Sequence, residues 1–192
     1  MNPHVSCAVL AAGASRRLGH PKQLARHRGA PLVRLAAECV RKSRASAAAV
    51  IVGADADSVR SALGNAPVEV LMNPDWQRGM ASSIHVAVAW AELQQSDALL
   101  LTLCDQPHLS AAHLDRLITE FEHSELPVAS YYAGRNAVPA LFPRSLFGSL
   151  SELSGDSGAR RVLNDGRPLR RISWPEGEFD VDTHESERKL IP

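Results

Sequence analysis

Cysteine is scarce in this chain, and its three cysteines (Cys7, Cys39 and Cys104) are scattered and form no C-x-x-C pair. An odd, scattered set excludes the dense disulfide framework of small secreted domains. The H-E-x-x-H pattern of zinc enzymes is absent too, and the eight histidines show no metal-site spacing. The sequence therefore predicts reduced thiols and a cytoplasmic protein.

Long apolar runs and an excess of charge of one sign are also missing. The apolar stretch near the N-terminus is too short for a signal peptide, and no segment approaches the length of a membrane span. Lys plus Arg equals Asp plus Glu at 21 each, so no basic field indicates a nucleic-acid partner. We expect a single domain over 1–192, long enough to bury its core without disulfides or a structural metal.

What the first part of the chain does contain is a regular alternation of strand and helix patterns. Apolar runs predict strands at 5–10, 48–52, 68–72 and 98–103, and helical spacing predicts helices that begin near Pro31, Asp57, Met80 and Ser110. Four such alternations favour an α/β fold in which helices cover both faces of a mostly parallel sheet. We therefore predict a Rossmann-like three-layer α/β/α sandwich.

The rhythm changes after Pro127. Apolar patterns there predict strands at 128–132, 139–142, 169–173 and 178–182, with one helix at 159–163. No repeat or long linker separates this part from the rest. We expect it to complete the same domain and to shape a substrate cleft.

The loop after the first strand is the most informative segment. It runs L-A-A-G-A-S-R-R-L-G-H-P-K from Leu10 to Lys22. Small residues directly after a buried strand let the backbone amides approach phosphate oxygens, and Arg17 and Lys22 add positive charge. The spacing excludes both the P-loop and the G-x-G-x-x-G dinucleotide fingerprint. The structural alternative is a surface turn rich in small residues with solvated arginines.

Carboxylates follow apolar segments at two places. The run L-L-L-T-L-C-D-Q-P leads a buried strand into Asp105, and ligands bind at the carboxyl ends of parallel strands. A bound magnesium ion would compensate such an acid. Near the end, Asp180 and Asp182 point to the same side if their segment is extended. A capping turn at Asp105 and a solvated turn or helix entry at the second pair are the structural alternatives.

Two further segments place polar groups at predicted helix starts. Asn73, Gly79, Ser82 and Ser83 join the third strand to its helix, where hydroxyls and amides can hold a ribose or a base edge. The turn from Ser154 to Arg160 is similar, and its arginine can bind a phosphate. Helix capping alone explains the serines equally well.

Together these motifs resemble one known family. The string L-A-A-G-x-S-x-R-x-G-x-x-K-x-L, met from Leu10 to Leu24, is similar to the signature of the molybdenum-cofactor nucleotidyltransferases, in the MobA-like NTP transferase family. The L-C-D-Q-P, G-D-x-G-A-R and D-[IV]-D-T motifs match in the same order, the last being followed by Glu185. The resemblance covers nearly the whole chain and implies the fold of the nucleotide-diphospho-sugar transferases.

The resemblance also implies an activity and its residues. It indicates a magnesium-dependent transfer of CMP from CTP to a molybdenum-pterin acceptor with release of pyrophosphate, because L-A-A-G is similar to the cytidylyl rather than the guanylyl branch. The implied catalytic residues are Arg17, Lys22 and Asp105, and the implied metal ligands are Asp105 and Asp182. Residues of the implied nucleotide site are Leu10, Ala11, Ala12, Gly13, Ser15, Arg17, Gly19, Lys22, Asn73, Gly79, Ser82 and Ser83, and those of the acceptor site are Gly155, Asp156 and Arg160.

By this resemblance, residues 1–126 form a nucleotide-binding half and residues 127–192 an acceptor-binding half. One departure affects the acceptor: where the family has G-x-x-G-H-P, Ala137 and Val138 replace the Gly and the His. Two other functions stay open, since close relatives are described as oxidoreductases and as accessory proteins of purine catabolism. The first predicts an enzyme that uses NAD(P)H. The second predicts a non-catalytic protein that serves a molybdoenzyme or its chaperone.

Overall fold

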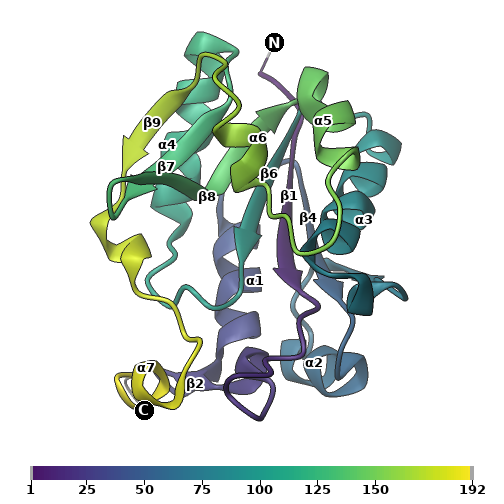
Figure 1. The fold of residues 1–192 in the computed structure, drawn as a ribbon, viewed down its shortest axis with the longest axis vertical. Helices are drawn as coiled ribbons and strands as arrows, with labels where there is room; N and C mark the ends of the chain where they lie inside the picture. Colours follow the sequence, from purple (N-terminus) through teal and green to yellow (C-terminus); the bar gives the residue numbers. More distant parts are fainter. Residues whose placement is uncertain (1, 191–192) are drawn as a thin grey trace.

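A seven-stranded sheet runs through the centre of the computed structural model, which describes residues 2–190 (Figure 1). Its strand order is β5-β4-β1-β6-β8-β7-β9. The strands are β1 (Val5–Ala11), β4 (Ala47–Val52), β5 (Glu69–Met72), β6 (Ala98–Leu103), β7 (Val128–Tyr132), β8 (Arg135–Pro143) and β9 (Arg170–Ser173). The two halves of the chain thus contribute to one continuous sheet.

Strand direction agrees with the predicted mostly parallel sheet. β1 pairs in parallel with β4 on one side and with β6 on the other, and β5 extends the parallel set. Strand β8 is antiparallel to both β6 and β7, whereas β9 is parallel to β7. The carboxyl ends of β1, β4, β5 and β6 therefore meet at one edge of the sheet, which is where ligands bind in open α/β sheets.

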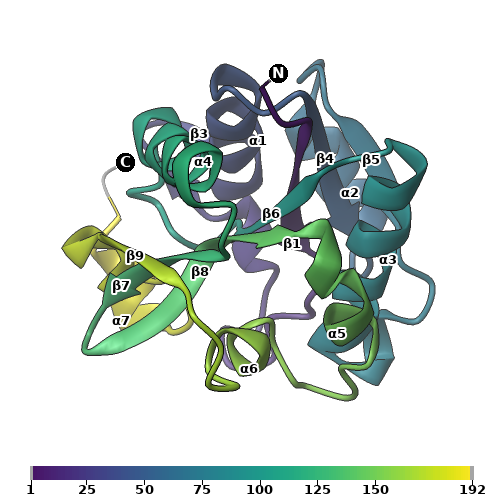
Figure 2. The same cartoon turned by 90° about the horizontal axis from the view of Figure 1, so that it is seen from above.

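Helices cover both faces (Figure 2). α1 (Leu32–Lys42), α2 (Ala56–Leu63) and α4 (Ala111–Ser124) share one core cluster with the β1 residues Val5, Cys7 and Val9. α3 (Met80–Leu93), α5 (Phe147–Ser151) and α6 (Arg160–Leu163) share the other with Ala8 and Leu10. Alternate side chains of β1 thus pack into two different cores, as expected for a strand that helices cover on both faces. This confirms the predicted three-layer α/β/α sandwich.

Local signals explain some of the helix boundaries. The Ser110 side chain accepts a hydrogen bond from the His113 N–H and so caps α4, as its position before the apolar pattern predicts. α2 ends at Gly64, which has a positive φ of 57°. The structure also contains a short hairpin, β2 (Arg26–His27) and β3 (Ala30–Pro31), which apolar periodicity did not predict.

The strand predicted at 178–182 is wrong. Pro175–Glu178 form the 3-10 helix η4, and α7 (His184–Arg188) follows after five residues without regular structure. Thr183 and Ser186 form a capping box that starts α7, a signal that the strand interpretation ignored. Residues 179–183 pair with no strand of the sheet. Instead the Val181 N–H donates to the Asp105 carbonyl at 3.0 Å.

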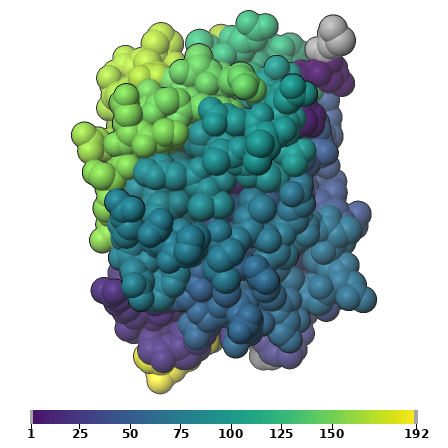
Figure 3. Space-filling view, turned by 90° about the vertical axis from the view of Figure 1, so that its right-hand side faces the viewer, coloured from purple at the N-terminus to yellow at the C-terminus, as the bar shows by residue number. Residues whose placement is uncertain are grey.

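The segment after β9 returns to the ligand edge of the sheet. In Figure 1 it descends from β9 to α7, which lies at the same end as the loop after β1. Val181 is fully buried in a small cluster with Ala25 and Leu32. In the space-filling view, C-terminal atoms lie against N-terminal ones at the lower edge (Figure 3). The last part of the described chain is thereby fixed beside one of the first.

No helix within residues 2–190 is both long enough and apolar enough to cross a lipid bilayer.

Candidate active site

The loop after β1 is held in shape by one buried side chain. Gln23, in the 3-10 helix η1 (Lys22–Leu24), donates to the carbonyls of Ala11 and Gly13 at 2.9 and 2.7 Å. Its amide oxygen accepts a bond from the Ser15 hydroxyl at 3.3 Å, and that hydroxyl accepts from the Lys22 N–H. Hydrogen bonds from Gln23 thus fix these two carbonyls on one side of the loop. The other side of the loop is left for a ligand.

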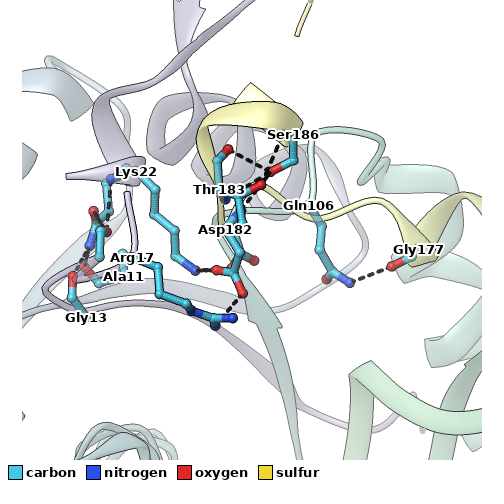
Figure 4. A network of polar contacts seen from close by, with 12 residues as sticks. Ala11, Gly13, Arg17, Lys22, Gln106, Gly177, Asp182, Thr183 and Ser186 are labelled. Carbon is cyan, nitrogen blue, oxygen red and sulfur yellow. Dashed lines mark hydrogen bonds and ion pairs between the residues drawn. The ribbon is translucent and has the colours of Figure 1, made fainter. Parts of the chain in front are cut away.

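Lys22 lies between two carboxylates, one shortly after β6 and one just before α7. Its ammonium contacts Asp105 Oδ2 at 2.5 Å and Asp182 Oδ1 at 2.6 Å. Arg17 reaches the other oxygen of Asp182 at 2.8 Å, and both cations approach this carboxylate from the loop side (Figure 4). The structure therefore brings together four residues that the sequence placed far apart, and all four were predicted to act in phosphate or metal binding.

The electrostatics of this cluster follow from its burial and its pairs. Burial lowers the pKa of Lys22, but the charge of Asp105 and hydrogen bonds to both carboxylates outweigh burial and raise it above the usual range. Burial raises the pKa of Asp182, and the hydrogen bond and charge of Lys22 overcome this and lower it. Lys22 and Asp182 are therefore both ionised at neutral pH.

A third carboxylate stands nearby. Desolvation, followed by repulsion from Asp105 and Asp182, raises the pKa of Asp180, although its side chain is exposed. Among residues 2–190 the buried atom Asp105 Oδ1 has no hydrogen-bond partner. A buried, unpartnered carboxylate oxygen is costly. It marks a position where a cation or a hydrogen-bond donor can bind.

The Asp182 carboxylate is positioned by the helix that follows it. The Ser186 hydroxyl accepts bonds from the N–H groups of Asp182 and Thr183, and the Thr183 hydroxyl accepts from the Ser186 N–H. The helix-entry alternative for this motif is thus correct as local structure. It also explains the geometry, because the cap fixes the backbone beside Lys22.

A cavity of about 370 Å³ opens beside this cluster. The loop forms one wall, the start of α3 forms another, and Leu103, Cys104 and Asp105 form the floor. Burial and then the charge of Asp105 raise the pKa of the Cys104 thiol to about 12, so this cysteine is an inert packing residue. A smaller cavity of about 200 Å³ shares Gly13, Arg16 and Lys22 with the first and is also lined by Arg17 and Asp182.

Gly79 allows the turn at 154–158 to cross the start of α3. A Cβ on Gly79 would lie 2.4 Å from the Gly155 carbonyl oxygen and 2.7 Å from Asp156 Oδ1, and its φ is +100°. The Ala81 N–H donates to that same carbonyl at 3.1 Å. This close crossing brings Asp156 into the lining of the large cavity.

The structure distributes the sequence-predicted site residues unevenly. Lining the larger cavity are Leu10, Ala11, Ala12, Gly13, Lys22, Gly79, Ser83, Asp105 and Asp156. Ser15 and Arg17 line the smaller one. Gly19, Asn73, Ser82, Gly155 and Arg160 line neither cavity. Buried Asn73 instead donates to the hydroxyls of Ser82 and Ser83 at 2.8 and 2.9 Å, and so holds the start of α3.

Arg16 and Gln23 are among the residues of this site that sequence reasoning missed. Arg16 lines both cavities, although its motif position had suggested no role. Gln23 shapes the loop, yet it is one polar residue among several after Lys22 and nothing in its type marks it. Only the burial of Gln23, 1% exposed, distinguishes it from a surface glutamine.

The segment that departs from the family motif lies in a buried polar network. The Tyr132 hydroxyl donates to the Val138 carbonyl at 3.0 Å, and Gln106 Nε2 donates to the Tyr132 oxygen at 3.0 Å. Ser130 donates to the Pro139 carbonyl at 2.6 Å and contacts His113 Nε2 at 2.7 Å. The backbone at Val138 and Pro139 is thus fixed by side chains behind it.

Residues 7–171 match the family model described as the MobA-like NTP transferase domain. The chain belongs to the MobA-like NTP transferase family. This confirms the resemblance first seen between Leu10 and Glu185.

Curated relatives of this MobA-like chain carry different names. It is 33% identical to "Nicotine blue oxidoreductase" of Paenarthrobacter nicotinovorans, over 98% of this chain and 97% of that one. It is 29% identical to "Purine catabolism protein PucB" of Bacillus subtilis, over 86% and 83%. A "Probable molybdenum cofactor guanylyltransferase" of Synechococcus elongatus is 38% identical over 55% of this chain and 53% of its own. Family membership alone therefore does not fix the substrate.

Solved structures agree with the family fold. Rv0371c from Mycobacterium tuberculosis superimposes with a TM-score of 0.84 at 32% identity, over 96% of both chains. A structure of the same protein in complex with manganese gives a TM-score of 0.81 at 29% identity, over 98% of both chains.

Proposed function

We propose that this MobA-like protein is a cytidylyltransferase, which transfers CMP from CTP to a molybdenum-pterin acceptor and releases pyrophosphate. The observation that carries the proposal is the position of Lys22, held between two carboxylates at the mouth of a cavity. Such an ammonium can exchange its carboxylate partners for phosphate oxygens when a nucleotide enters. Charge neutralisation and positioning supply most of the catalysis in phosphoryl and nucleotidyl transfer.

The loop supplies the phosphate contacts in this proposal. Among the described residues, the N–H groups of Gly13, Ala14 and Arg16 donate no hydrogen bond, which leaves three backbone donors beside the cavity. A Cβ on Gly13 would meet nothing within 4 Å, so packing does not require glycine there. The space beside Gly13 therefore suits the close approach of a phosphate to the backbone.

The donor set fits a divalent cation, which we predict to be Mg²⁺. Asp105 and Asp182 would hold it, because carboxylate oxygens are the ligands that Mg²⁺ prefers and Asp105 Oδ1 lacks a partner. When bound, such a cation neutralises charge on the phosphate oxygens. The manganese complex of Rv0371c supports the same expectation for this chain. Asp180 lies close enough to contribute to the negative field.

The chemical step needs two anions in contact. An ionised phosphate oxygen of the acceptor attacks the α-phosphorus of CTP, a new P–O bond forms, and the bond to the pyrophosphate oxygen breaks. Lys22, Arg16 and Arg17 stabilise the departing charge, and Asp156 faces the same cavity from the opposite wall. In this proposal residues 1–126 bind the nucleotide and residues 127–192 bind the acceptor, with Gly155 and Arg160 toward the acceptor.

The experiment is pyrophosphate release from CTP, GTP, ATP and UTP with Mg²⁺, with and without molybdenum-pterin. Release that requires both CTP and the pterin supports the proposal. Release with GTP in place of CTP would keep the transferase and correct the nucleotide. Nucleotide binding without pyrophosphate release in the presence of the pterin would rule out the pterin as the acceptor. The altered Ala137–Val138 segment would then be the reason to search for another acceptor. No binding of any nucleotide would overturn the whole proposal.

A second candidate function is an NAD(P)H-dependent oxidoreductase. The relative named nicotine blue oxidoreductase, similar over nearly the full length of both chains, is the observation that favours it. The loop after β1 lacks the G-x-G-x-x-G pattern of a dinucleotide site, which counts against it. Equilibrium binding of NADPH together with no binding of CTP would select the oxidoreductase.

A third candidate is a non-catalytic accessory protein, favoured by the relative named as a purine catabolism protein. It would bind pterin and a molybdoenzyme or its chaperone but release no pyrophosphate. The intact Asp105 and Asp182 carboxylates, with Lys22 between them, count against an inert protein, because they offer the charges that a nucleotide and its cation need.

A further inference from the structure

A cluster of two histidines and one glutamate lies outside the cavity that the proposed function uses. His20 belongs to the loop after β1, whereas His184 and Glu187 belong to α7, and one donor atom from each lies within 4.8 Å of the others. His20 Nε2 contacts Glu187 Oε1 at 2.8 Å, and His184 Nδ1 lies 3.8 Å from Glu187 Oε2. The two oxygens of one carboxylate thus face two different imidazoles.

The arrangement on α7 suits chelation. Residues three apart share one face of a helix, so His184 and Glu187 present their donors side by side. His20 supplies a third donor from a segment far away in the sequence. The ring centroids of the two histidines are 5.8 Å apart, so both imidazoles lie at the same small patch of surface.

The donor set of the cluster matches a divalent ion. Two imidazole nitrogens and one carboxylate oxygen lie close enough together to bind the same ion. Both histidines are exposed and Glu187 is half-buried, so an ion can reach the cluster from solvent.

We propose that His20, His184 and Glu187 form a binding site for a divalent transition-metal ion of the Zn²⁺ class. Two imidazole nitrogens and one carboxylate oxygen select Zn²⁺, Co²⁺ or Ni²⁺ over Mg²⁺, which prefers oxygen donors. Three protein ligands leave at least one coordination position for water. The site is separate from Asp105 and Asp182, and its existence does not depend on the proposed transferase activity.

The position of this site gives it a consequence for the active site. His20 precedes Lys22 by two residues, and His184 follows Asp182 by two. An ion held by His20, His184 and Glu187 cross-links the loop to α7, and so fixes the segments that carry the Lys22–Asp182 pair. We therefore expect metal binding to keep the loop and α7 together.

The test is a Zn²⁺ titration of tag-free, metal-stripped, full-length protein against a chromophoric chelator, with Co²⁺ absorption as a second probe. We expect His20→Ala and His184→Ala each to weaken Zn²⁺ binding by roughly tenfold or more, since losing even an outer-shell partner costs ~10–100-fold. Glu187→Gln can still hydrogen-bond to His20 but lacks the charge, and we expect it to weaken binding as well. His123→Ala removes an exposed histidine from α4 and should leave binding unchanged.

Two further measurements separate this site from the carboxylates. Asp105→Asn protein should retain the Zn²⁺ site, and hydrogen exchange of residues 179–190 should slow with Zn²⁺ in the wild type but not in His184→Ala. Zn²⁺ binding that is lost in Asp105→Asn yet kept in His184→Ala would overturn the proposal and place the ion at the active-site acids. Equal Zn²⁺ binding by the wild type and both histidine variants would overturn it as well.

Discussion

The polar groups at the cavity and those beside β7 are both buried, but they are used in opposite ways. At the cavity, Asp105 keeps one oxygen without a partner and Lys22 is shared between two acids. Beside β7, the donor groups of Tyr132, Ser130 and Gln106 all bond to oxygens of the protein, although Gln106 Oε1 is, like Asp105 Oδ1, a buried atom without a hydrogen-bond partner. An unpartnered oxygen of a charged group beside a cavity points to a bound cation, whereas neutral groups whose donors all bond to the protein point to a structural role.

Asp105→Asn tests the cavity side of this comparison and has the largest expected effect. The substitution keeps the shape but removes the charge opposite Lys22, so turnover should fall about 10²–10³-fold, as on loss of one preorganised electrostatic group. The measurement is pyrophosphate release, with circular dichroism to verify the fold. Asp57→Asn, an exposed acid on α2, is the matched control and should keep full activity. Near-normal turnover in Asp105→Asn would remove this residue from the mechanism.

His113, which contacts Ser130 in the polar network beside β7, tests the structural side of this comparison through the pH dependence of folding stability. Burial, and then the charge of Arg116, lowers the pKa of His113 to about 4, whereas the unfolded chain has an ordinary histidine near 6.5. Between these values the unfolded state binds the extra proton, so stability rises with pH over this window and falls as pH drops toward 4. The fall should reach about 3 kcal/mol.

Urea unfolding between pH 4 and 7 measures this slope. His113→Gln should flatten it, because the titrating group is gone. His123→Gln, on the exposed side of the same helix, should keep the slope of the wild type. An unchanged slope in His113→Gln would mean that other groups set the acid sensitivity.

Gln106→Leu has a smaller expected effect. It removes the donor that reaches the Tyr132 oxygen and leaves the Val138 carbonyl with Tyr132 alone, so stability should fall by about 1–2 kcal/mol. Urea unfolding gives the change, and CTP binding is measured alongside. A large loss of CTP affinity at unchanged stability would contradict the structural role and extend the ligand site to Gln106.

Glu185→Gln should have the smallest effect. Glu185 occupies the acidic position after the D-V-D-T motif, but its side chain is 83% exposed and pairs with Lys189 one helical turn later. Exposed pairs of this kind contribute roughly 0.3–0.5 kcal/mol. Unfolding and turnover should both stay near wild type. A marked loss of turnover would show that the motif acid acts directly.

The sequence predicted correctly those features of the fold whose signals lie within a short stretch of the chain. Four strand–helix alternations are repeated local patterns, and from them the layers and the parallel core were predicted correctly. The strand predicted at 178–182 failed because its apolar residue Val181 packs against Ala25 and the Leu32 side chain of α1, a tertiary contact that no alternation reveals. Motif spacing predicted the functions of Asp105 and Lys22, but only the fold shows that the two side chains are in contact.

The same limit explains the two histidines. Their spacing shows no metal motif because His20 and His184 lie at opposite ends of the chain, and only the return of the C-terminal segment brings them together. Arg16 and Gln23 escaped prediction for a related reason, because their positions beside the cavity depend on how the loop folds over η1.

The return of the chain to its own beginning also makes the site vulnerable to a single cut in the backbone. Val181 is buried against Ala25 and Leu32, and this packing holds the segment that carries Asp182. All strands of the central sheet precede this segment, so cleavage after β9 would remove no strand. It would leave Lys22 with Asp105 but without Asp182, and so would damage the site before the architecture.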